Sequence, residues 1–194
     1  KQKGYIMKTI LLVNASPRAQ GNSEVITQIL AEDLKDQRVV VFTMREKDCR
    51  YCKACGACQG TAGQSCVQDD DITKLLPVIE ACDAIVVATP IYNQQVSSLA
   101  KLFIERFYPW FDFDKKGMSN TAKYGKKAAL VCSFWGSPKD RVKTYADWTV
   151  SGFCQMGAEQ FQTLIFNHIP NAGDVANRPD YLEQVHQLAC WLNE

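Results

Sequence analysis

The sequence predicts an α/β fold in which helices cover both faces of a doubly wound, five-stranded parallel sheet. Strand-like apolar runs alternate with helix-like segments five times along the 194 residues. Three of the runs are continuously apolar, a pattern that strands show when both faces of their sheet are buried under helices. The length suits one domain, and no repeat or interdomain linker divides it.

We expect this domain to span residues 7–194. Met7 has the features of a natural start, and the six residues before it show no strand or helix pattern. We therefore expect residues 1–6 to be an added or disordered extension and leave them out of the fold prediction.

The predicted strands are short runs rich in β-branched and aliphatic residues. They cover residues 8–13, 38–43, 84–88, 127–133 and 160–166. Between the second and third strands, residues 45–70 are polar and rich in cysteine and have no clean period, so we expect a long loop there.

The predicted helices carry apolar residues on one face at helical spacing. They lie at residues 22–34, 72–79, 97–108, 142–156 and 181–192. Asn22 or Ser23 is expected to cap the first helix, and the carboxylates of residues 69–71 suit the start of the second. Pro77 is expected to kink the second helix or split it in two.

Composition and charge narrow the class of function. Charged residues make up 22% of the chain and the formal net charge is +1, so we expect neither nucleic acid nor an anionic membrane as partner. No apolar run reaches the roughly 18 residues of a membrane-spanning helix, and no signal peptide is visible. We expect a cytoplasmic protein that acts on a small molecule.

The loop after the first strand, 14-NASPRAQGN-22, has the composition of a phosphate cradle. Ser16 and Ser23 offer hydroxyls, Arg18 offers a fork of donors, and Gly21 lets the backbone come close to a ligand. The following helix points its free N–H groups at the same place. The loop matches neither the dinucleotide fingerprint nor the P-loop, which favours a single phosphate monoester over a nucleoside triphosphate. The alternative is a polar turn with a solvated arginine.

Two further loops, 89-TPIYNQQ-95 and 133-SFWGSP-138, also follow strands, and ligands of open parallel sheets bind at this carboxyl edge. Pro90 fixes the chain where a flat ring can lie, and backbone groups near Tyr92 can bond the ring's polar edge. Alternatively, Tyr92 covers the core and the aromatic residues of the later loop only pack.

Three segments together resemble the NADPH-dependent FMN reductases and iron–sulfur flavoproteins of the flavodoxin-like superfamily. They are 14-NASPRAQGNSE-24, 52-CKACGACQGTAGQSCVQDDD-71 and 89-TPIYNQQVSSLAKLFIER-106. The resemblance implies strand order 2-1-3-4-5, with FMN at the carboxyl edge of the sheet. It departs at Ala15, where the family usually has glycine, and we expect this methyl group to narrow the loop without abolishing phosphate binding.

Carried over by position, the resemblance assigns residues to each part of FMN. The phosphate would be held by Ser16, Arg18, Gly21, Asn22 and Ser23. The isoalloxazine would be met by Pro90, Ile91, Tyr92 and Asn93, and on its other side by Ser133, Phe134, Trp135 and Gly136.

The resemblance also implies a homodimer or homotetramer with the flavin near a subunit interface. An aromatic cluster after the third helix either supplies that interface or caps the core. It consists of Phe107, Tyr108, Trp110, Phe111 and Phe113.

The nine cysteines favour a reducing compartment, because their number is odd and the apolar content already suffices for a core. Cys52, Cys55 and Cys58 have C-x2-C-x2-C spacing, with Cys66 eight positions later. This pattern resembles that of iron–sulfur flavoproteins, although the last gap is slightly longer than in members that hold a cluster. The alternatives are no metal at all, with the thiols as loop packing, or a zinc ion on four thiolates. Cysteines inside strand and helix patterns are expected to be buried: Cys82, Cys132, Cys154 and Cys190.

These expectations predict an FMN-dependent oxidoreductase that takes electrons from NAD(P)H and passes them to a quinone, an azo or nitro aromatic, free flavin or a similar acceptor. No catalytic side chain is assigned, because the flavin carries the chemistry. Two alternatives remain: an iron–sulfur flavoprotein that acts as an electron carrier, and a redox- or metal-sensing module based on the cysteine loop.

Overall fold

A computed structural model describes residues 7–59, 66–110, 123–136 and 138–194. Its parallel strands are β1 (Thr9–Asn14), β2 (Arg38–Thr43), β3 (Ala84–Tyr92), β5 (Lys126–Ser133) and β6 (Ala158–Phe166). They lie in the order β2-β1-β3-β5-β6, and the two-residue strand β4 (Gln95–Val96) pairs antiparallel with β3. Apart from the short β4, this is the predicted flavodoxin-like order 2-1-3-4-5.

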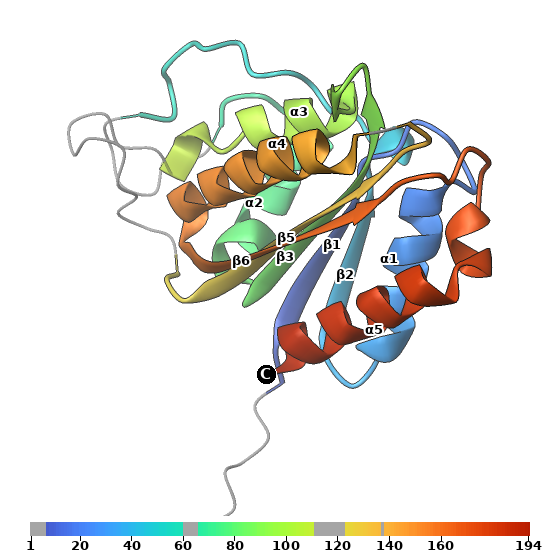
Figure 1. The fold of residues 1–194 in the computed structure, drawn as a ribbon. Helices are drawn as coiled ribbons and strands as arrows, with labels where there is room; N and C mark the ends of the chain where they lie inside the picture. Colours follow the sequence, from blue (N-terminus) through green and yellow to red (C-terminus); the bar gives the residue numbers. More distant parts are fainter. Residues whose placement is uncertain (1–6, 60–65, 111–122, 137) are drawn as a thin grey trace, which may run out of the picture.

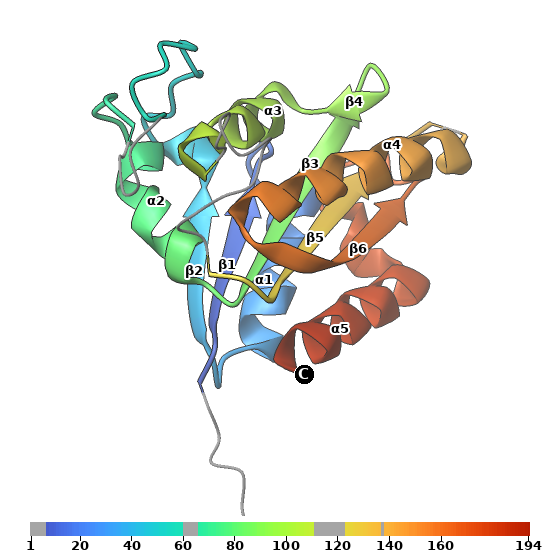
Figure 2. The ribbon, with the colours of Figure 1, turned by 90° about the vertical axis from the view of Figure 1, so that its left-hand side faces the viewer.

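Helices cover both faces of the sheet (Figures 1 and 2). One face carries α1 (Asn22–Asp33) and α5 (Pro179–Asn193), and the other carries α2 (Asp71–Ala81), α3 (Ser98–Glu105) and α4 (Lys139–Ser151). None of these helices is long and apolar enough to cross a membrane. The prediction of helices on both faces of a parallel sheet is confirmed.

The sheet separates two hydrophobic clusters, because successive side chains of a strand point to opposite faces. In β1, Leu11 and Val13 pack toward α2 and α3, whereas Ile10 and Leu12 pack toward α1 and α5. All four are fully buried, which explains why this run is continuously apolar in the sequence.

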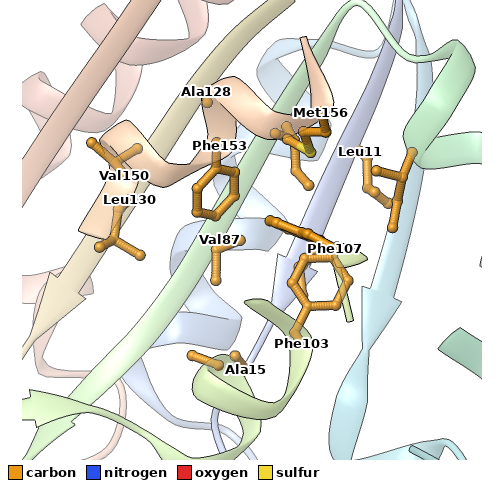
Figure 3. Packing of buried hydrophobic residues seen from close by; sticks show 14 of the residues in the cluster. Leu11, Ala15, Val87, Phe103, Phe107, Ala128, Leu130, Val150, Phe153 and Met156 are labelled. Atoms are coloured by element: carbon orange, nitrogen blue, oxygen red, sulfur yellow. The ribbon is translucent and has the colours of Figure 1, made fainter. Parts of the chain in front are cut away.

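Aromatic rings fill the first cluster (Figure 3). Phe107 lies 5.3 Å from Phe103 and 5.1 Å from Phe153 between ring centroids, in edge-to-face geometry. Phe107 and Trp110 are almost fully buried within the chain, so they are core residues and not free interface surface. Tyr108 is exposed, and Phe111 and Phe113 lie outside the described residues.

Pro77 does not split α2, which runs without interruption from Asp71 to Ala81. Proline removes one backbone donor and leaves the carbonyl four residues earlier without its helical partner. Pro77 is exposed, whereas Leu75, Leu76 and Ile79 are buried and hold the helix on the core.

A buried ion pair closes the base of the cysteine-rich loop. Arg106 Nη1 and Nη2 donate to the two carboxylate oxygens of Asp70, at 2.5 and 3.1 Å, and Nη1 also donates to the backbone carbonyl of Arg50. Asp70 in turn accepts from the backbone N–H groups of Arg50 and Thr73, the second as the cap of α2. The two ends of the loop and the end of α3 thus meet at one carboxylate.

Opposing effects set the protonation of this carboxylate. Burial alone would raise the pKa of Asp70, but the hydrogen bonds from Arg106, Thr73 and Arg50 outweigh it and hold the pKa well below its ordinary value. A lowered folded-state pKa stabilises the fold above the pKa of the unfolded chain, and that contribution is lost as the pH falls through the folded-state pKa.

Replacing the arginine of this pair tests its importance. Arg106→Met leaves Asp70 buried and unpaired, so we expect urea unfolding at pH 7 to show a loss of about 3 to 5 kcal/mol. The double variant Arg106→Met, Asp70→Asn should recover part of this loss, because no buried charge remains. Arg50→Met, which removes an exposed pair with Asp48, serves as the control and should change little. An Arg106→Met protein with wild-type stability contradicts this account.

Candidate cofactor site

The loop between β1 and α1 is a tight polar turn built from its own hydrogen bonds. Ser16 N donates to Asn14 Oδ1 at 3.1 Å, and Arg18 N donates to Ser16 Oγ, also at 3.1 Å. A Cβ at Gly21 would lie 3.3 Å from the carbonyl oxygen of Arg18 and 3.4 Å from Ser16 Oγ. Because Gly21 has no side chain, the backbone can make this tight turn, and no side-chain atom crowds the Arg18 carbonyl or the Ser16 hydroxyl.

Helix α1 begins here without a side-chain cap. Gly21 is the N-cap residue, with φ −77° and ψ 171°, so the expectation that Asn22 or Ser23 caps the helix is wrong. The first intrahelical bond runs from Glu24 N to Gly21 O at 3.0 Å. The backbone N–H groups of Asn22 and Ser23 come before that bond, at the positive end of the helix dipole, where an anion is stabilised.

The side chain of Asn22 fixes a different loop. Its Nδ2 donates to the carbonyl of Asn171 at 3.0 Å, and its Oδ1 accepts from Val175 N at 3.0 Å. These bonds hold the segment after β6 against the start of α1. Any contribution of Asn22 to ligand binding therefore falls to its backbone N–H group.

A buried hydroxyl network joins this loop to the end of β3. Ser97 Oγ donates to the carbonyl of Ala15 at 2.6 Å, and Ser97 N donates to Thr89 Oγ1 at 3.1 Å. Ser97 Oγ also accepts from Ala100 N as the cap of α3. The spacing between the two loops is thus fixed by buried hydrogen bonds.

Strand β3 continues four residues beyond the predicted end and turns into β4 through a tight hairpin. Asn93 and Gln94 have φ of 48° and 67°, and the pairing of Tyr92 with Gln95 makes them the two central residues. Positive φ at both positions defines a type I′ turn, whose twist matches paired strands. Pro90, Ile91 and Tyr92 are therefore strand residues and not the loop that we expected.

The segment after β5 is held by the segment after β6. Phe134 N donates to the carbonyl of Phe166 at 2.9 Å, and Ile169 N donates to the carbonyl of Phe134 at 3.3 Å. This pairing brings Ile169 and Pro170 to the same edge of the sheet, a contribution that the sequence analysis did not assign.

These four segments enclose a cavity of about 230 Å³. All but two of the predicted cofactor residues line it, together with Ile169 and Pro170. The lining residues are Ser16, Arg18, Gly21, Asn22, Ser23, Pro90, Ile91, Tyr92, Ser133, Phe134, Trp135, Ile169 and Pro170. Asn93 lies at the hairpin tip and Gly136 lines a neighbouring cavity.

The donor set of this cavity fits a phosphate group at one end and a flat ring at the other. Ser16, Arg18 and the start of α1 supply hydroxyl, guanidinium and amide donors, as phosphates require. Asn14 Nδ2, at the base of the same turn, is buried and has no hydrogen-bond partner among the described residues. Pro90, Ile91 and Trp135 form the less polar end.

The cysteine-rich loop forms a separate cavity of about 250 Å³. Cys52, Cys55, Cys58 and Cys66 all line it, together with Tyr108. Cys55 is exposed and the other three thiols are half-buried. Cys49 packs against the hydrophobic core instead, and burial raises the pKa of its thiol to about 11.

The four thiols do not share one electrostatic environment. Burial raises the pKa of Cys58. Burial would also raise the pKa of Cys66, but the backbone N–H of Gln68 and the charge of Arg106 outweigh it and lower that pKa. Among the residues with described positions, no group of three or more His, Cys, Asp or Glu side chains is arranged to hold a metal ion.

The remaining cysteines divide into two pairs. Cys82 and Cys132 are buried as expected, and burial raises the pKa of Cys132 to about 12. Cys154 and Cys190 are exposed, so their predicted burial is wrong. Both lie on helical segments with their side chains exposed. At such positions the apolar spacing of a sequence does not distinguish a buried cysteine from an exposed one.

Comparison with known proteins identifies relatives by sequence. An iron–sulfur flavoprotein of Archaeoglobus fulgidus is 33% identical over 97 residues, which are 49% of this chain and 43% of that protein. An iron–sulfur flavoprotein of Methanosarcina thermophila is 27% identical over 138 residues, 70% of each chain. The chain spans less than half the length of the two Archaeoglobus fulgidus relatives that it matches, 43% and 47%.

Solved structures share the fold over nearly the whole chain. An NAD(P)H:quinone oxidoreductase from Methanothermobacter marburgensis superposes with a TM-score of 0.73 at 13% identity, covering 97% of this chain and 98% of that one. An azoreductase from Bacillus anthracis superposes with a TM-score of 0.67 at 17% identity, covering 94% and 99%.

The family described as NADPH-dependent FMN reductase matches residues 7–158, which include the β1–α1 turn, the cysteine-rich loop and the end of β3. This match and the flavodoxin-like strand order agree. The chain therefore belongs to the NADPH-dependent FMN reductase family.

Proposed function

We propose that this protein is an FMN-dependent oxidoreductase that takes electrons from NAD(P)H and passes them to a small aromatic acceptor. One observation carries the proposal: the segments that follow β1, β3, β5 and β6 meet around a single cavity. This is where open parallel sheets bind nucleotides. Membership in the FMN reductase family supports the identity of the cofactor.

The phosphate end of FMN would lie against the β1–α1 turn. The N–H groups of Asn22 and Ser23 would donate to phosphate oxygens, and Arg18 would balance the charge. The Ser16 hydroxyl, which donates to the carbonyl of Arg18 at 3.3 Å, would rotate to donate to the phosphate. Gly21 gives these donors room, because any side chain there would crowd the Arg18 carbonyl.

The isoalloxazine would lie between the end of β3 and the segment after β5. Pro90 has no N–H to donate, and the pairing of Tyr92 with Gln95 in the hairpin occupies the backbone of Tyr92. The backbone of Ile91 is therefore left to bond the ring's polar edge, with Tyr92 and Asn93 beside it at the hairpin. Phe134 and Trp135 both line this cavity, and Trp135 is 69% exposed, so aromatic surface is available to the ring. Gly136 would contribute from the neighbouring cavity.

A bound FMN supplies the hydride and electron chemistry with NAD(P)H and the acceptor, so no side chain of this chain has to act as acid or base. A quinone, an azo or nitro aromatic or a free flavin would suit as acceptor. The names of the structural neighbours, a quinone oxidoreductase and an azoreductase, are in line with this class. We further expect a cytoplasmic homodimer or homotetramer.

Anaerobic reduction tests the proposed function. The protein is loaded with FMN, freed of excess cofactor and mixed with NADPH or NADH, and the flavin absorbance is followed. We expect bleaching within seconds and recovery of the absorbance when a quinone is added. An equal concentration of free FMN is the control. Persistent yellow colour with both nicotinamide donors would reject the reductase function while leaving an FMN carrier.

The cysteine-rich loop favours a second candidate function, electron transfer through an iron–sulfur cluster. Its four predicted ligands border one cavity, and the backbone N–H of Gln68 and the charge of Arg106 lower the pKa of Cys66. Compact loops with x2 spacing can aim several thiolates at one centre. The same thiols would serve the remaining candidates, a zinc site or a redox- or metal-sensing loop.

Metal and sulfide analysis separates these candidates. For an iron–sulfur carrier, protein purified without air contains iron and acid-labile sulfide in equal amounts. Both are lost in Cys55→Ser and Cys58→Ser. Cys49→Ser and Cys154→Ser, which alter thiols outside the cavity, are the controls and keep both. Zinc without sulfide indicates the zinc site. If neither metal is found in any of the proteins, the iron–sulfur carrier and the zinc site are both rejected and the redox-sensing loop is left.

A further inference from the structure

A second cavity of about 350 Å³ adjoins the candidate cofactor site. The two cavities share Ile91, Phe134 and Trp135 as lining residues. A ligand in the second cavity would therefore lie across the same side chains that we assign to the isoalloxazine end of FMN. This position is where a reaction partner of the flavin must approach.

The walls of the second cavity suit a flat aromatic molecule. Phe134 and Trp135 come from the segment after β5, and Pro138 and Val142 come from the start of α4. Trp135 is 69% exposed, so a ring stacked on its indole would remove a large apolar surface from water.

A guanidinium group belongs to one of the residues that line this cavity. Arg141, in the first turn of α4, donates from Nη1 to Gln94 Oε1 at 2.9 Å, which links α4 to the β3–β4 hairpin. A guanidinium has five N–H donors, so one bond to an amide leaves capacity for a second acceptor. Carboxylate and sulfonate oxygens match the planar fork of arginine.

The surrounding charges do not cancel this positive charge. The start of α4 carries Lys139, Arg141 and Lys143 against Asp140, and Lys143 is engaged with Asp147. The N-cap residue Pro138 makes no side-chain hydrogen bond to the first N–H groups of the helix. The helix dipole also favours an anion at this end.

We propose that this cavity binds a planar aromatic electron acceptor that carries a carboxylate or sulfonate, with the ring on Trp135 and the anionic group on Arg141. The inference rests on the proposed reductase function and narrows its substrate class. The anionic groups of a nicotinamide dinucleotide share the same chemistry, and the test separates the two sources.

Equilibrium dialysis against FMN-loaded protein gives a binding measurement that needs no turnover. The probes are anthraquinone-2-sulfonate and the neutral 2-(hydroxymethyl)anthraquinone, because anthraquinones do not react with exposed thiols. Arg141→Gln should raise the Kd of the sulfonate about tenfold, as expected for losing a charge-assisted hydrogen bond at an exposed position. The Kd of the neutral probe should stay within about twofold, because stacking on Trp135 is kept.

Two further variants sharpen the test. Arg141→Lys keeps the charge but not the fork, so it should recover part of the affinity. Lys143→Gln removes a positive charge from the same helix outside the cavity and should leave both probes unchanged. In proteins that show reduction by NADPH, the KM for NADPH should not change in Arg141→Gln.

Three results overturn the inference. One is an equal effect of Arg141→Gln on both probes, and the second is no effect on either. The third is that Arg141→Gln raises only the KM for NADPH, which would mean that Arg141 binds the dinucleotide and not the acceptor. If the protein binds the sulfonate as described but is not reduced by NAD(P)H, the binding site stands and the proposed function fails.

Discussion

The hydrogen bond from Ser97 Oγ to the carbonyl of Ala15 is the constraint on which the candidate site depends. It is buried and 2.6 Å long, and it ties the turn after β1 to the first residue before α3. Thr89, three residues before the end of β3, completes the network through its hydroxyl. Buried hydroxyls that are fully paired have little freedom to move, so the two loops that would grip opposite ends of FMN keep a fixed separation.

The other end of α3 has an equivalent role at the cysteine-rich loop. Ser97 precedes the helix and Arg106 follows it, where the guanidinium holds Asp70 and the carbonyl of Arg50. The eight residues between them span about 12 Å at 1.5 Å per residue. One short, amphipathic helix therefore positions both the turn proposed to hold a phosphate and the loop proposed to hold a metal cluster.

The two candidate sites are carried by different kinds of structure. The candidate cofactor cavity is built on strand ends and helix starts, which the parallel sheet places at one edge. The cysteine cavity is built on a loop that is held by side-chain contacts. Asp48, Arg50, Asp70 and Arg106 bond at its base, and Gln59 and Gln68 donate to the backbone carbonyls of Tyr108 and Tyr51. A bound metal would add folding free energy to this loop.

Much of the fold could be predicted because its signals are local. Short apolar runs, three of them continuous, predicted all five parallel strands to within four residues, and the stripe from Tyr181 to Leu192 predicted α5. The β3–β4 hairpin was missed because its turn uses Asn93 and Gln94 at positive φ, where glycine is the usual sign. Of the two outcomes expected at Pro77, a kink or a split of α2, the split is wrong, because α2 runs from Asp71 to Ala81 through the proline.

The site was predictable where it follows strand ends directly, and less so where it depends on tertiary contacts. Ile169 and Pro170 reach the cavity only because Phe134 pairs with the segment after β6. The burial of Arg106 did leave a signal, since it lies three residues after Phe103 on the apolar face of α3 and four after Leu102. A charge at such a position predicts a buried partner, but only the structure identifies that partner as Asp70.

The relative affinity of the apoprotein for FMN and riboflavin, measured by isothermal titration calorimetry, tests the central claim most directly. These ligands differ only in the phosphate, so a grip by Ser16, Arg18 and the start of α1 should make FMN bind at least about 100-fold more tightly. The same ratio should fall sharply in Gly21→Val, which crowds the turn, but not in Gly152→Ala, where a Cβ meets nothing within 4 Å. Equal affinities for the two flavins in the wild-type protein would contradict the account.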